Sequence, residues 1–276
     1  MINDITVIIV SYKSQITILN CIKSIKRFNK ILILDNSNDK KLKNYIKKKY
    51  SKIHFFLSKK NIGYGAGYNF LLKKVKTPYA LLMTPDTSFK EGTLNKFLIS
   101  LRKFQDDYCL MGPYKQNKNF GLETKKNINM ARLILGFSML INIKNINKNN
   151  FFDEKFFLYL EDIDLCRRLV SAKKKIYINK SFLIDHIGAK SSNLGKNEFD
   201  QIRNWHWMWS QYYYYKKYNG NFLAITKFLS KLIVTLLKCS VLYLFQNENY
   251  IRYKYRAKGL FSSMIGKKSY LRPDKI

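Results

Sequence analysis

The feature that most constrains the fold is a regular alternation of short, β-branched apolar runs with segments of helical periodicity. Residues 5–12 (ITVIIVSY) are nearly all apolar, which is typical of a central parallel strand covered on both faces. Residues 15–28 then repeat apolar side chains at spacings of three and four, as an amphipathic helix does. Further strands are expected at 31–34, 53–57, 79–83, 108–111 and 175–179, and further helices at 40–50 and 91–104. We therefore expect an α/β fold with a mostly parallel, doubly wound sheet flanked by helices.

Polar residues follow two of the expected strands. Ligands of open α/β sheets bind beyond the carboxyl ends of the strands, so carboxylates there are candidate contacts. Asp35 ends the second strand, where it could equally cap the next helix. Asp86 follows the strand at 79–83 and is presented rigidly by the preceding Pro85. In that position Asp86 is a candidate to hold a hard divalent cation through oxygen.

A glycine-rich turn, residues 61–69 (NIGYGAGYN), runs into a helix. Glycines let the backbone approach a phosphate-bearing ligand closely. The spacing departs from the dinucleotide fingerprint, and the turn follows a third strand rather than the first, which disfavours a nicotinamide enzyme.

Residues 151–169 (FFDEKFFLYLEDIDLCRRL) concentrate carboxylates beside aromatic side chains. Residues 156–160 suit a buried strand end, after which Glu161 and Asp162 open a helix, where the N-terminal dipole favours negative charge. Asp164 and Arg168 are spaced to pair along that helix. Taken alone, an acidic helix start is readily explained as a structural feature, so the catalytic interpretation depends on what else reaches the same edge of the sheet.

Three further segments bear on such a site. Residues 114–129 are rich in Lys, Asn and Gly and are expected to form a mobile loop over it. Residues 133–143 are interpreted as a strand in which Gly136 marks a close approach, either on the acceptor side or against a neighbouring helix. His186 follows a short apolar run and is a metal ligand only if other ligands converge on it.

The last quarter of the chain differs in character and predicts a boundary between a catalytic domain at 1–196 and a helical, aromatic and basic extension at 197–276. Residues 222–245 predict a long apolar helix whose lysines, 227, 231 and 238, fall within about 40° of one another. Such a helix lies in a membrane interface, or it packs on the α/β core with snorkelling lysines.

The net charge of +33 is compatible with nucleic acid or an anionic membrane as partner, or with a coding bias toward lysine. The arginine-rich, aromatic patch of a nucleic-acid binder is missing from the sequence, so no specific nucleic acid is expected. The four cysteines have no metal spacing and indicate buried thiols in a reducing compartment. A strand-like start without a signal peptide predicts a cytoplasmic protein.

The ordered set TVIIVSY, LDNS, NIGYGAGYN, TPD, the acidic stretch and His186 resembles the family 2 glycosyltransferases, the inverting GT-A group. The likeness covers roughly residues 5–192 and is strongest to rhamnosyltransferase-type bacterial members that build cell-surface polysaccharide. It implies a GT-A fold, with a Rossmann-like, mostly parallel sheet flanked by helices and, here, a C-terminal helical extension.

The resemblance also implies roles for particular residues. The nucleotide-sugar would be bound by Ser11, Tyr12, Asp35, Asn61, Gly63, Gly65, Asn69 and Asp86. Mg²⁺ or Mn²⁺ would be held by Asp86 and His186, and the catalytic base would come from Asp162, with Glu161 as its nearest rival. Two positions depart from the family pattern: Lys13 stands where Asn is usual, and Thr84 replaces the first acidic or amide residue of the metal-binding triplet.

The expected activity is transfer of rhamnose or a similar sugar from a dTDP- or UDP-sugar to a lipid-linked or other glycan acceptor. The enzyme would work as a peripheral protein on the inner face of the cytoplasmic membrane. Two alternatives are a sugar nucleotidyltransferase on a similar sheet and a non-catalytic basic protein that binds nucleic acid or membrane through charge.

Overall fold

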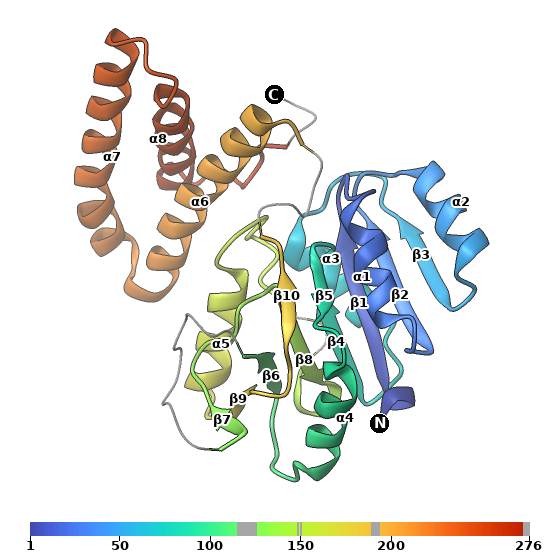
Figure 1. Cartoon of the computed structure of the whole chain (residues 1–276). Coiled ribbons are helices and arrows are strands. Elements are labelled where there is room, and N and C mark those ends of the chain that lie inside the picture. The colour runs from blue at the N-terminus through green and yellow to red at the C-terminus, as the bar shows by residue number, and fades with distance from the viewer. Residues whose placement is uncertain (115–125, 148, 150, 189–193, 273–276) are drawn as a thin grey trace. The chain divides into compact units, whose positions relative to one another are not determined.

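The computed structural model describes residues 1–114, 126–147, 149, 151–188 and 194–272 (Figure 1). The chain divides into two compact units. One consists of Met1–Asp153 and Glu161–Asn193, and the other of Glu154–Leu160 and Leu194–Ile276. Most of the expected loop at 114–129 lies outside the described residues.

The first unit is built on an eight-stranded sheet in the order β3-β2-β1-β4-β8-β6-β9-β7. Its strands are β1 (Ile5–Ser11), β2 (Lys30–Asp35), β3 (Ile53–Leu57), β4 (Tyr79–Met83), β6 (Leu110–Pro113), β7 (Ile128–Met130), β8 (Ser138–Asn142) and β9 (Ile176–Asn179). β3, β2, β1 and β4 are parallel neighbours, as are β6 and β9. β8 runs antiparallel between β4 and β6, and β7 pairs antiparallel with β9. The predicted, mostly parallel α/β sheet is confirmed.

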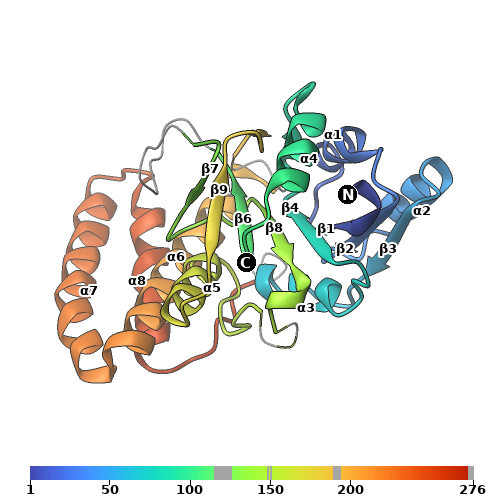
Figure 2. The ribbon, with the colours of Figure 1, turned by 90° about the horizontal axis from the view of Figure 1, so that it is seen from below.

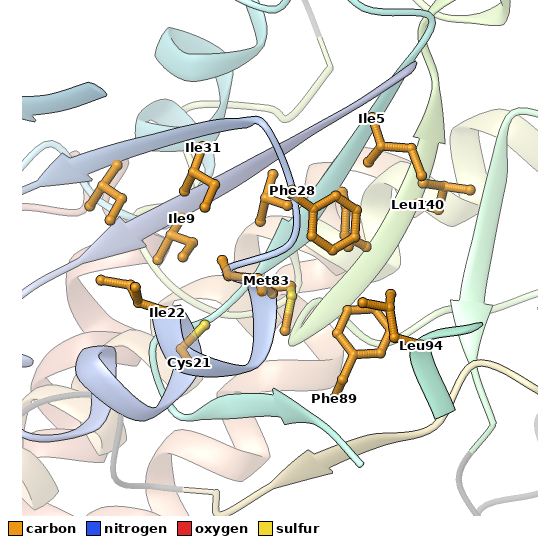
Figure 3. Packing of buried hydrophobic residues seen from close by; sticks show 14 of the residues in the cluster. Ile5, Ile9, Cys21, Ile22, Phe28, Ile31, Met83, Phe89, Leu94 and Leu140 are labelled. Atoms are coloured by element: carbon orange, nitrogen blue, oxygen red, sulfur yellow. The ribbon is translucent and has the colours of Figure 1, made fainter. Parts of the chain in front are cut away.

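Helices cover both faces of this sheet because its central strands are apolar on both sides. The helices are α1 (Thr17–Ile25), α2 (Lys40–Lys49), α3 (Tyr64–Leu72), α4 (Thr93–Lys103) and α5 (Glu161–Ser171). Along β1, Val7 and Ile9 join a core with α1, α2 and α4, part of which Figure 3 shows. The alternate residues Ile8 and Val10 join a second core with α3 and α5. Figure 2 shows α1 and α4 on one face of the sheet and α3 on the other.

A two-stranded antiparallel sheet adjoins the carboxyl end of β4. It consists of β5 (Thr87–Phe89) and β10 (Ile184–His186), and it pairs Thr87 with His186. This pairing brings β10, which is far from β5 in the sequence, close to Asp86, the residue that precedes β5.

The second unit is a bundle of α6 (Lys196–Asn219), α7 (Asn221–Leu244) and α8 (Tyr250–Met264) (Figure 1). Gly220, with a left-handed φ of 84°, separates α6 from α7. At Gly259 of α8 an added Cβ would lie 2.1 Å from the Trp205 carbonyl oxygen, so this glycine allows α8 to approach α6 closely. No helix among the described residues combines the length and the apolarity that crossing a membrane requires.

Residues 154–160 belong to this second unit, and the expected strand end at 156–160 is wrong. Phe156 packs edge-on against Tyr213 of α6, and the Ser210 hydroxyl donates a hydrogen bond of 2.9 Å to the Leu158 carbonyl. The aromatic segment therefore buries its side chains along a helix rather than in a sheet. It ends with two consecutive non-glycine residues in the left-handed region, Tyr159 (φ 71°) and Leu160 (φ 68°), immediately before α5.

Candidate active site

The carboxyl ends of β1 and β2 are joined by a buried polar network around Asp35, which is fully buried. Its carboxylate accepts hydrogen bonds from the Ser11 hydroxyl (2.9 Å), the Ser37 hydroxyl (2.8 Å) and the Asp39 amide (2.8 Å). The N-cap of α2 is Asp39, which accepts from the Leu42 amide, so Asp35 is not the cap. Asp35 instead fixes the loops at which β1 and β2 end.

The loop after β1 contains Tyr12 and the unusual Lys13. Lys13 has a left-handed φ of 48°, and its amide donates to the Ser37 hydroxyl at 3.2 Å. Asn tolerates this conformation better than Lys does, which gives a physical reason for the Asn in the family pattern. The Tyr12 amide donates to the Ser14 hydroxyl at 3.2 Å, so the whole turn is held by local hydrogen bonds.

The glycine-rich turn is tied to the same edge. Gly63 has a left-handed φ of 91°, its amide donates to the Asn61 side chain at 3.0 Å, and its carbonyl accepts from the Asn36 side chain at 3.1 Å. The Asn36 side-chain oxygen is buried and has no hydrogen-bond partner in the described part of the chain. Asn36 is therefore a candidate ligand contact that sequence reasoning passed over within the LDNS motif.

The remaining glycines of the turn are explained by packing. An added Cβ at Gly67 would lie 2.9 Å from Val10, and one at Gly65 would lie 3.0 Å from Phe152. The buried Asn69 accepts from the Phe152 amide and donates to its carbonyl, both at 2.9 Å. These contacts press α3 against β1 and fix the segment that leads toward the acidic stretch.

Asp86 and His186 lie together, as the sequence predicted. The His186 Nε2 atom is 3.3 Å from Asp86 Oδ2, and the ring of Phe137 stacks on the His186 ring at 4.6 Å. Burial raises the pKa of Asp86, but hydrogen bonds from His186 and Thr84 outweigh it and leave that pKa below its ordinary value. The other carboxylate oxygen, Oδ1, is buried without a hydrogen-bond partner in the described residues.

The buried Oδ1 atom of Asp86, which has no hydrogen-bond partner in the described residues, supports binding of a divalent cation at Asp86 and His186. Among the described residues there is no group of three or more His, Cys, Asp and Glu side chains that could enclose a metal on its own. Asp86 and His186 thus supply an incomplete ligand set, which suits Mg²⁺ or Mn²⁺ bound jointly with a diphosphate and water. Thr84 contributes no carboxylate, and its hydroxyl oxygen also lies 3.3 Å from the Phe137 carbonyl oxygen, a second acceptor for its single proton.

The acidic pair opens α5. Asp162 Oδ2 accepts a hydrogen bond of 2.7 Å from the Gly136 amide, and Oδ1 accepts from the Ile163 amide at 2.9 Å. Glu161 is buried, and its Oε2 atom has no partner among the described residues. The predicted pairing of Asp164 with Arg168 is present at 2.8 Å and holds the helix together.

The two adjacent carboxyl groups differ in their proton affinity. Burial, and next the charge of Asp162, raises the pKa of Glu161 well above its ordinary value. Burial also raises the pKa of Asp162, but the Gly136 and Ile163 amides favour its ionised form and limit the rise. Of the pair, Asp162 is therefore the carboxyl group whose ionised form the surroundings favour more.

Residues 136–137 connect the acidic pair to the Asp86–His186 pair. The Gly136 amide binds Asp162, and the Gly136 carbonyl accepts a hydrogen bond from the Tyr64 hydroxyl. The next residue, Phe137, accepts from the Thr84 amide at 3.0 Å and stacks on His186. Asp162, His186 and Asp86 are thus connected through residues 136–137 at the carboxyl edge of β4.

Tyr64 is a second residue at the site, after Asn36, that sequence reasoning missed. Burial raises the pKa of its hydroxyl well above the ordinary value, and Tyr68, Glu161, Asp162 and Asp86 raise it further, so Tyr64 lies within electrostatic range of all three carboxylates. The available signal was its position between two glycines of the turn, on the first residue of α3.

Comparison with known proteins identifies the family. A model of the family described as "Glycosyl transferase family 2" matches residues 6–168, which is more than half of the chain. The chain belongs to this family. The match favours glycosyl transfer over nucleotidyl transfer and over a non-catalytic basic protein.

Individual relatives of this family 2 glycosyltransferase agree with that assignment. The low-salt glycan biosynthesis hexosyltransferase Agl10 of Haloferax volcanii is 24% identical over 259 residues, covering 84% of this chain and 79% of that protein. The structure of a mannosyltransferase from Pyrobaculum calidifontis with GDP-Man and Mn²⁺ superposes with a TM-score of 0.57 at 9% identity, over 95% of this chain and 86% of that one. GalNAc-T7 with UDP, GalNAc and Mn²⁺ gives a TM-score of 0.55 at 12% identity, over 66% of this chain and 42% of that one. These structural likenesses confirm the predicted GT-A fold.

Proposed function

We propose that this glycosyltransferase moves a hexose, rhamnose or a similar sugar, from a dTDP- or UDP-sugar to a lipid-linked glycan, with inversion at the anomeric carbon. It would act in cell-surface polysaccharide synthesis at the inner face of the cytoplasmic membrane. The observation that carries the proposal is that residues 136–137 contact both Asp162, through the Gly136 amide, and His186, through the Phe137 ring, while His186 lies 3.3 Å from Asp86. The relative named for glycan biosynthesis supports a hexose and a glycan.

In this proposal the nucleotide-sugar lies along the carboxyl ends of β1, β2 and β4. Ser11, Tyr12 and Asp35 form the nucleotide pocket, beside the turn from Asn61 through Gly63, with the buried Ser11–Asp35 pair fixing the loops that bear Tyr12. Gly65 and Asn69 act by positioning, since their contacts bring α3 against β1 and against Phe152.

Asp86 and His186 would hold Mg²⁺ or Mn²⁺ against the diphosphate. When bound, such a cation stabilises the negative charge that develops on the diphosphate as the sugar departs. Asp86 suits this part because its low pKa keeps the carboxylate ionised at neutral pH and its Oδ1 atom has no other partner among the described residues.

Asp162 is the proposed general base. The acceptor hydroxyl must lose a proton as it attacks the anomeric carbon, and only an ionised carboxylate can take that proton. The backbone amides of Gly136 and Ile163 favour the ionised form of Asp162, whereas burial and the charge of Asp162 disfavour the ionised form of Glu161. A single displacement inverts the anomeric centre and needs no nucleophile from the protein.

The test compares Asp162→Asn with wild type in transfer and in donor binding. Asparagine can still accept the Gly136 amide hydrogen bond through its side-chain oxygen, so the fold and the binding of nucleotide-sugar should persist. Transfer should fall by about 10²–10⁴-fold. Near-normal transfer by a folded, donor-binding Asp162→Asn protein would refute the base assignment.

Asp185→Asn is the matched control, because Asp185 is an exposed carboxylate on β10 beside the proposed metal ligand. It should transfer at the wild-type rate. A screen of nucleotide-sugars by thermal shift with Mn²⁺ identifies the donor, and failure of every nucleotide-sugar to stabilise the protein would contradict the proposed function itself.

A further inference from the structure

An exposed apolar face runs along α7. Its exposed large side chains include Phe222, Leu229, Ile233, Leu237 and Leu244, which are 48–77% accessible. At 100° per residue, the exposed apolar positions of α7 span about 180° of the helix surface. A soluble helix that packs on a core normally exposes polar side chains there, so this face is unusual.

The opposite side of α7 accounts for its packing. Ala224, Phe228, Leu232 and Thr235 are buried and share a narrow stripe that contacts the other helices of the unit. Within the helical unit, packing therefore does not use the broad apolar surface of α7. The packing contacts of α7 with α6 and α8 involve only the narrow stripe.

The lysines of α7 lie at one border between the packed stripe and the apolar face. Neighbouring helices hold them there: Lys227 lies 4.1 Å over the Tyr215 ring, Lys231 donates to the Gln211 side chain at 2.6 Å, and Lys238 lies 5.8 Å over a ring of α8. Every charged side chain within α7 and α8 is basic. The apolar face is thus bordered by cationic groups whose positions are fixed.

Charge decides which partner fits this face. Two copies of a chain with a net charge of +33 repel each other, which opposes burial of the face in a dimer. The same charge is attracted to an anionic bilayer, and a helix with a wide apolar arc beside lysines is suited to the boundary between headgroups and acyl chains. We propose that the exposed face of α7 docks this protein on an anionic phospholipid surface.

This inference deepens the proposed function, on which it rests for the idea that a lipid-linked acceptor is reached at that surface. The helix would lie in the plane of the interface. Its exposed apolar side chains, between Phe222 and Leu244, would enter the acyl region, and Lys227, Lys231 and Lys238 would lie at the phosphates. Such a helix is about 36 Å long, which gives the contact its extent.

The experiment measures sedimentation of the full chain with vesicles of phosphatidylcholine containing one third phosphatidylglycerol, and with vesicles of phosphatidylcholine alone. The protein should bind the anionic vesicles, and salt should weaken the binding. Leu229→Gln, Ile233→Gln and Leu237→Gln in one chain should lower the partition coefficient by at least about tenfold. These side chains are exposed, so the variant should fold, and far-ultraviolet circular dichroism checks that it does.

Two matched controls separate this face from general hydrophobicity and charge. Ile16→Gln, Ile99→Gln and Met130→Gln remove equally exposed apolar side chains of the first unit and should leave vesicle binding unchanged. Lys227→Gln, Lys231→Gln and Lys238→Gln should weaken binding. Lys41→Gln, Lys47→Gln and Lys48→Gln, which change the net charge equally on the exposed side of α2, should not.

Wild-type binding by the α7 apolar variant would overturn the proposal, as would equal binding of the wild type to neutral and anionic vesicles. A wild-type dimer in light scattering that becomes a monomer in that variant, without vesicle binding, would assign the face to a second copy instead. Donor binding measured by thermal shift without vesicles keeps the two proposals apart. If the protein binds a donor but no vesicles, only the docking proposal is refuted. If it binds vesicles but recognises no nucleotide-sugar, only the proposed activity is refuted.

Discussion

At the scale of single residues, environment rather than residue type separates the two carboxyl groups at the start of α5. Glu161 is buried with an unpaired oxygen, while Asp162 next to it receives two backbone amide hydrogen bonds. Burying a carboxylate oxygen without a hydrogen bond disfavours its ionised form, so the pKa of Glu161 is raised further than backbone hydrogen bonding allows for Asp162. Where two neighbouring carboxyl groups differ in this way, the one whose ionised form is favoured is the better candidate for a base.

Glu161→Gln tests this difference through stability. The pKa of Glu161 is raised in the folded state, so its contribution to stability is fully present below the unfolded-state pKa and is lost as the pH rises through the folded-state pKa. Glutamine is neutral at every pH. The variant should therefore match wild type in acid and gain melting temperature relative to it as the pH is raised.

Thermal denaturation of both proteins across the pH range measures that difference. Asp185→Asn again serves as control, and its melting temperature should track wild type throughout. A Glu161→Gln protein whose melting temperature stays parallel to that of wild type from acid to alkaline pH would mean that Glu161 ionises normally in the fold.

His186→Gln tests the metal site. The variant loses the imidazole that lies 3.3 Å from Asp86, so Mn²⁺ should bind more weakly, by about 10–100-fold for loss of one ligand-shell group. Calorimetric or magnetic-resonance titration of Mn²⁺ in the presence of nucleotide measures the affinity directly. His54→Gln, at an exposed position of β3, should bind Mn²⁺ as wild type does. Chelation should abolish transfer by the wild type, and transfer that is indifferent to chelation would remove the metal from the proposal.

The charged site residues could be selected from the sequence because each follows a strand or begins a helix. Asp86, His186, Glu161 and Asp162 each stand at such a junction. Tyr64 could not be selected, because its part depends on a hydrogen bond to the Gly136 carbonyl, 72 positions away. Sequence patterns report which face a residue occupies and leave open which distant backbone group it meets.

At the scale of elements, the junction before β8 determines the geometry of the site. The expected strand at 133–143 is shorter, Ser138–Asn142, because residues 136–137 leave the sheet to bind Tyr64, Asp162 and His186. The glycine that the sequence marked as a close approach is indeed approached, by side chains at the starts of two helices, Tyr64 of α3 and Asp162 of α5. An apolar pattern cannot reveal this, since the residues that leave the strand are as apolar as those that stay.

Gly136→Ala tests the importance of this junction. An added Cβ would lie 3.0 Å from the Tyr64 hydroxyl and 3.1 Å from Asp162 Oδ2, so both groups must move by a few tenths of an ångström. The φ of Gly136 is not positive, so the variant suffers crowding without backbone strain. Transfer should fall by roughly 10²-fold through misplacement of the base, while donor binding is kept.

Gly112→Ala is the control for crowding, because its Cβ would meet Ile134 at 2.6 Å and touch none of the site residues named above. It should lower the melting temperature and leave the rate per folded molecule unchanged. If Gly136→Ala behaves in the same way, the Gly136 contact has no part in catalysis.

At the scale of the whole molecule, the chain has separate hydrophobic cores in its two units. The sheet and its helices bury two clusters, and α6, α7 and α8 bury a third. Alternation and helical periodicity predicted most strands and helices of the sheet unit and, in the helical unit, α7 alone. The assignment of residues 154–160 to the helical unit could not be predicted. Aromatic side chains such as Phe156 fit the pattern of a strand and also pack well against a helix.

Gly259→Ala separates the contributions of the two units. Its Cβ would lie 2.1 Å from the Trp205 carbonyl, so α8 must move away from α6, at a cost of about 1–3 kcal/mol. Each kcal/mol lowers the melting temperature of a unit of this size by about 4–8 °C. We expect calorimetry to show the transition of the helical unit lowered and that of the sheet unit unchanged, with Gly195→Ala, whose Cβ meets nothing within 4 Å, as the control.

The order in which functions are lost on heating follows from the chain path. Residues 154–160 pack on α6 and continue directly into Glu161 and Asp162, so melting of the helical unit releases the start of α5 while the strand ends that carry Asp35 and Asp86 stay folded. Transfer should therefore be lost at the lower transition and nucleotide binding only at the higher one, and Gly259→Ala should widen the gap between the two. Loss of both functions at one temperature, moved as a single step by Gly259→Ala, would show instead that the two units unfold as one.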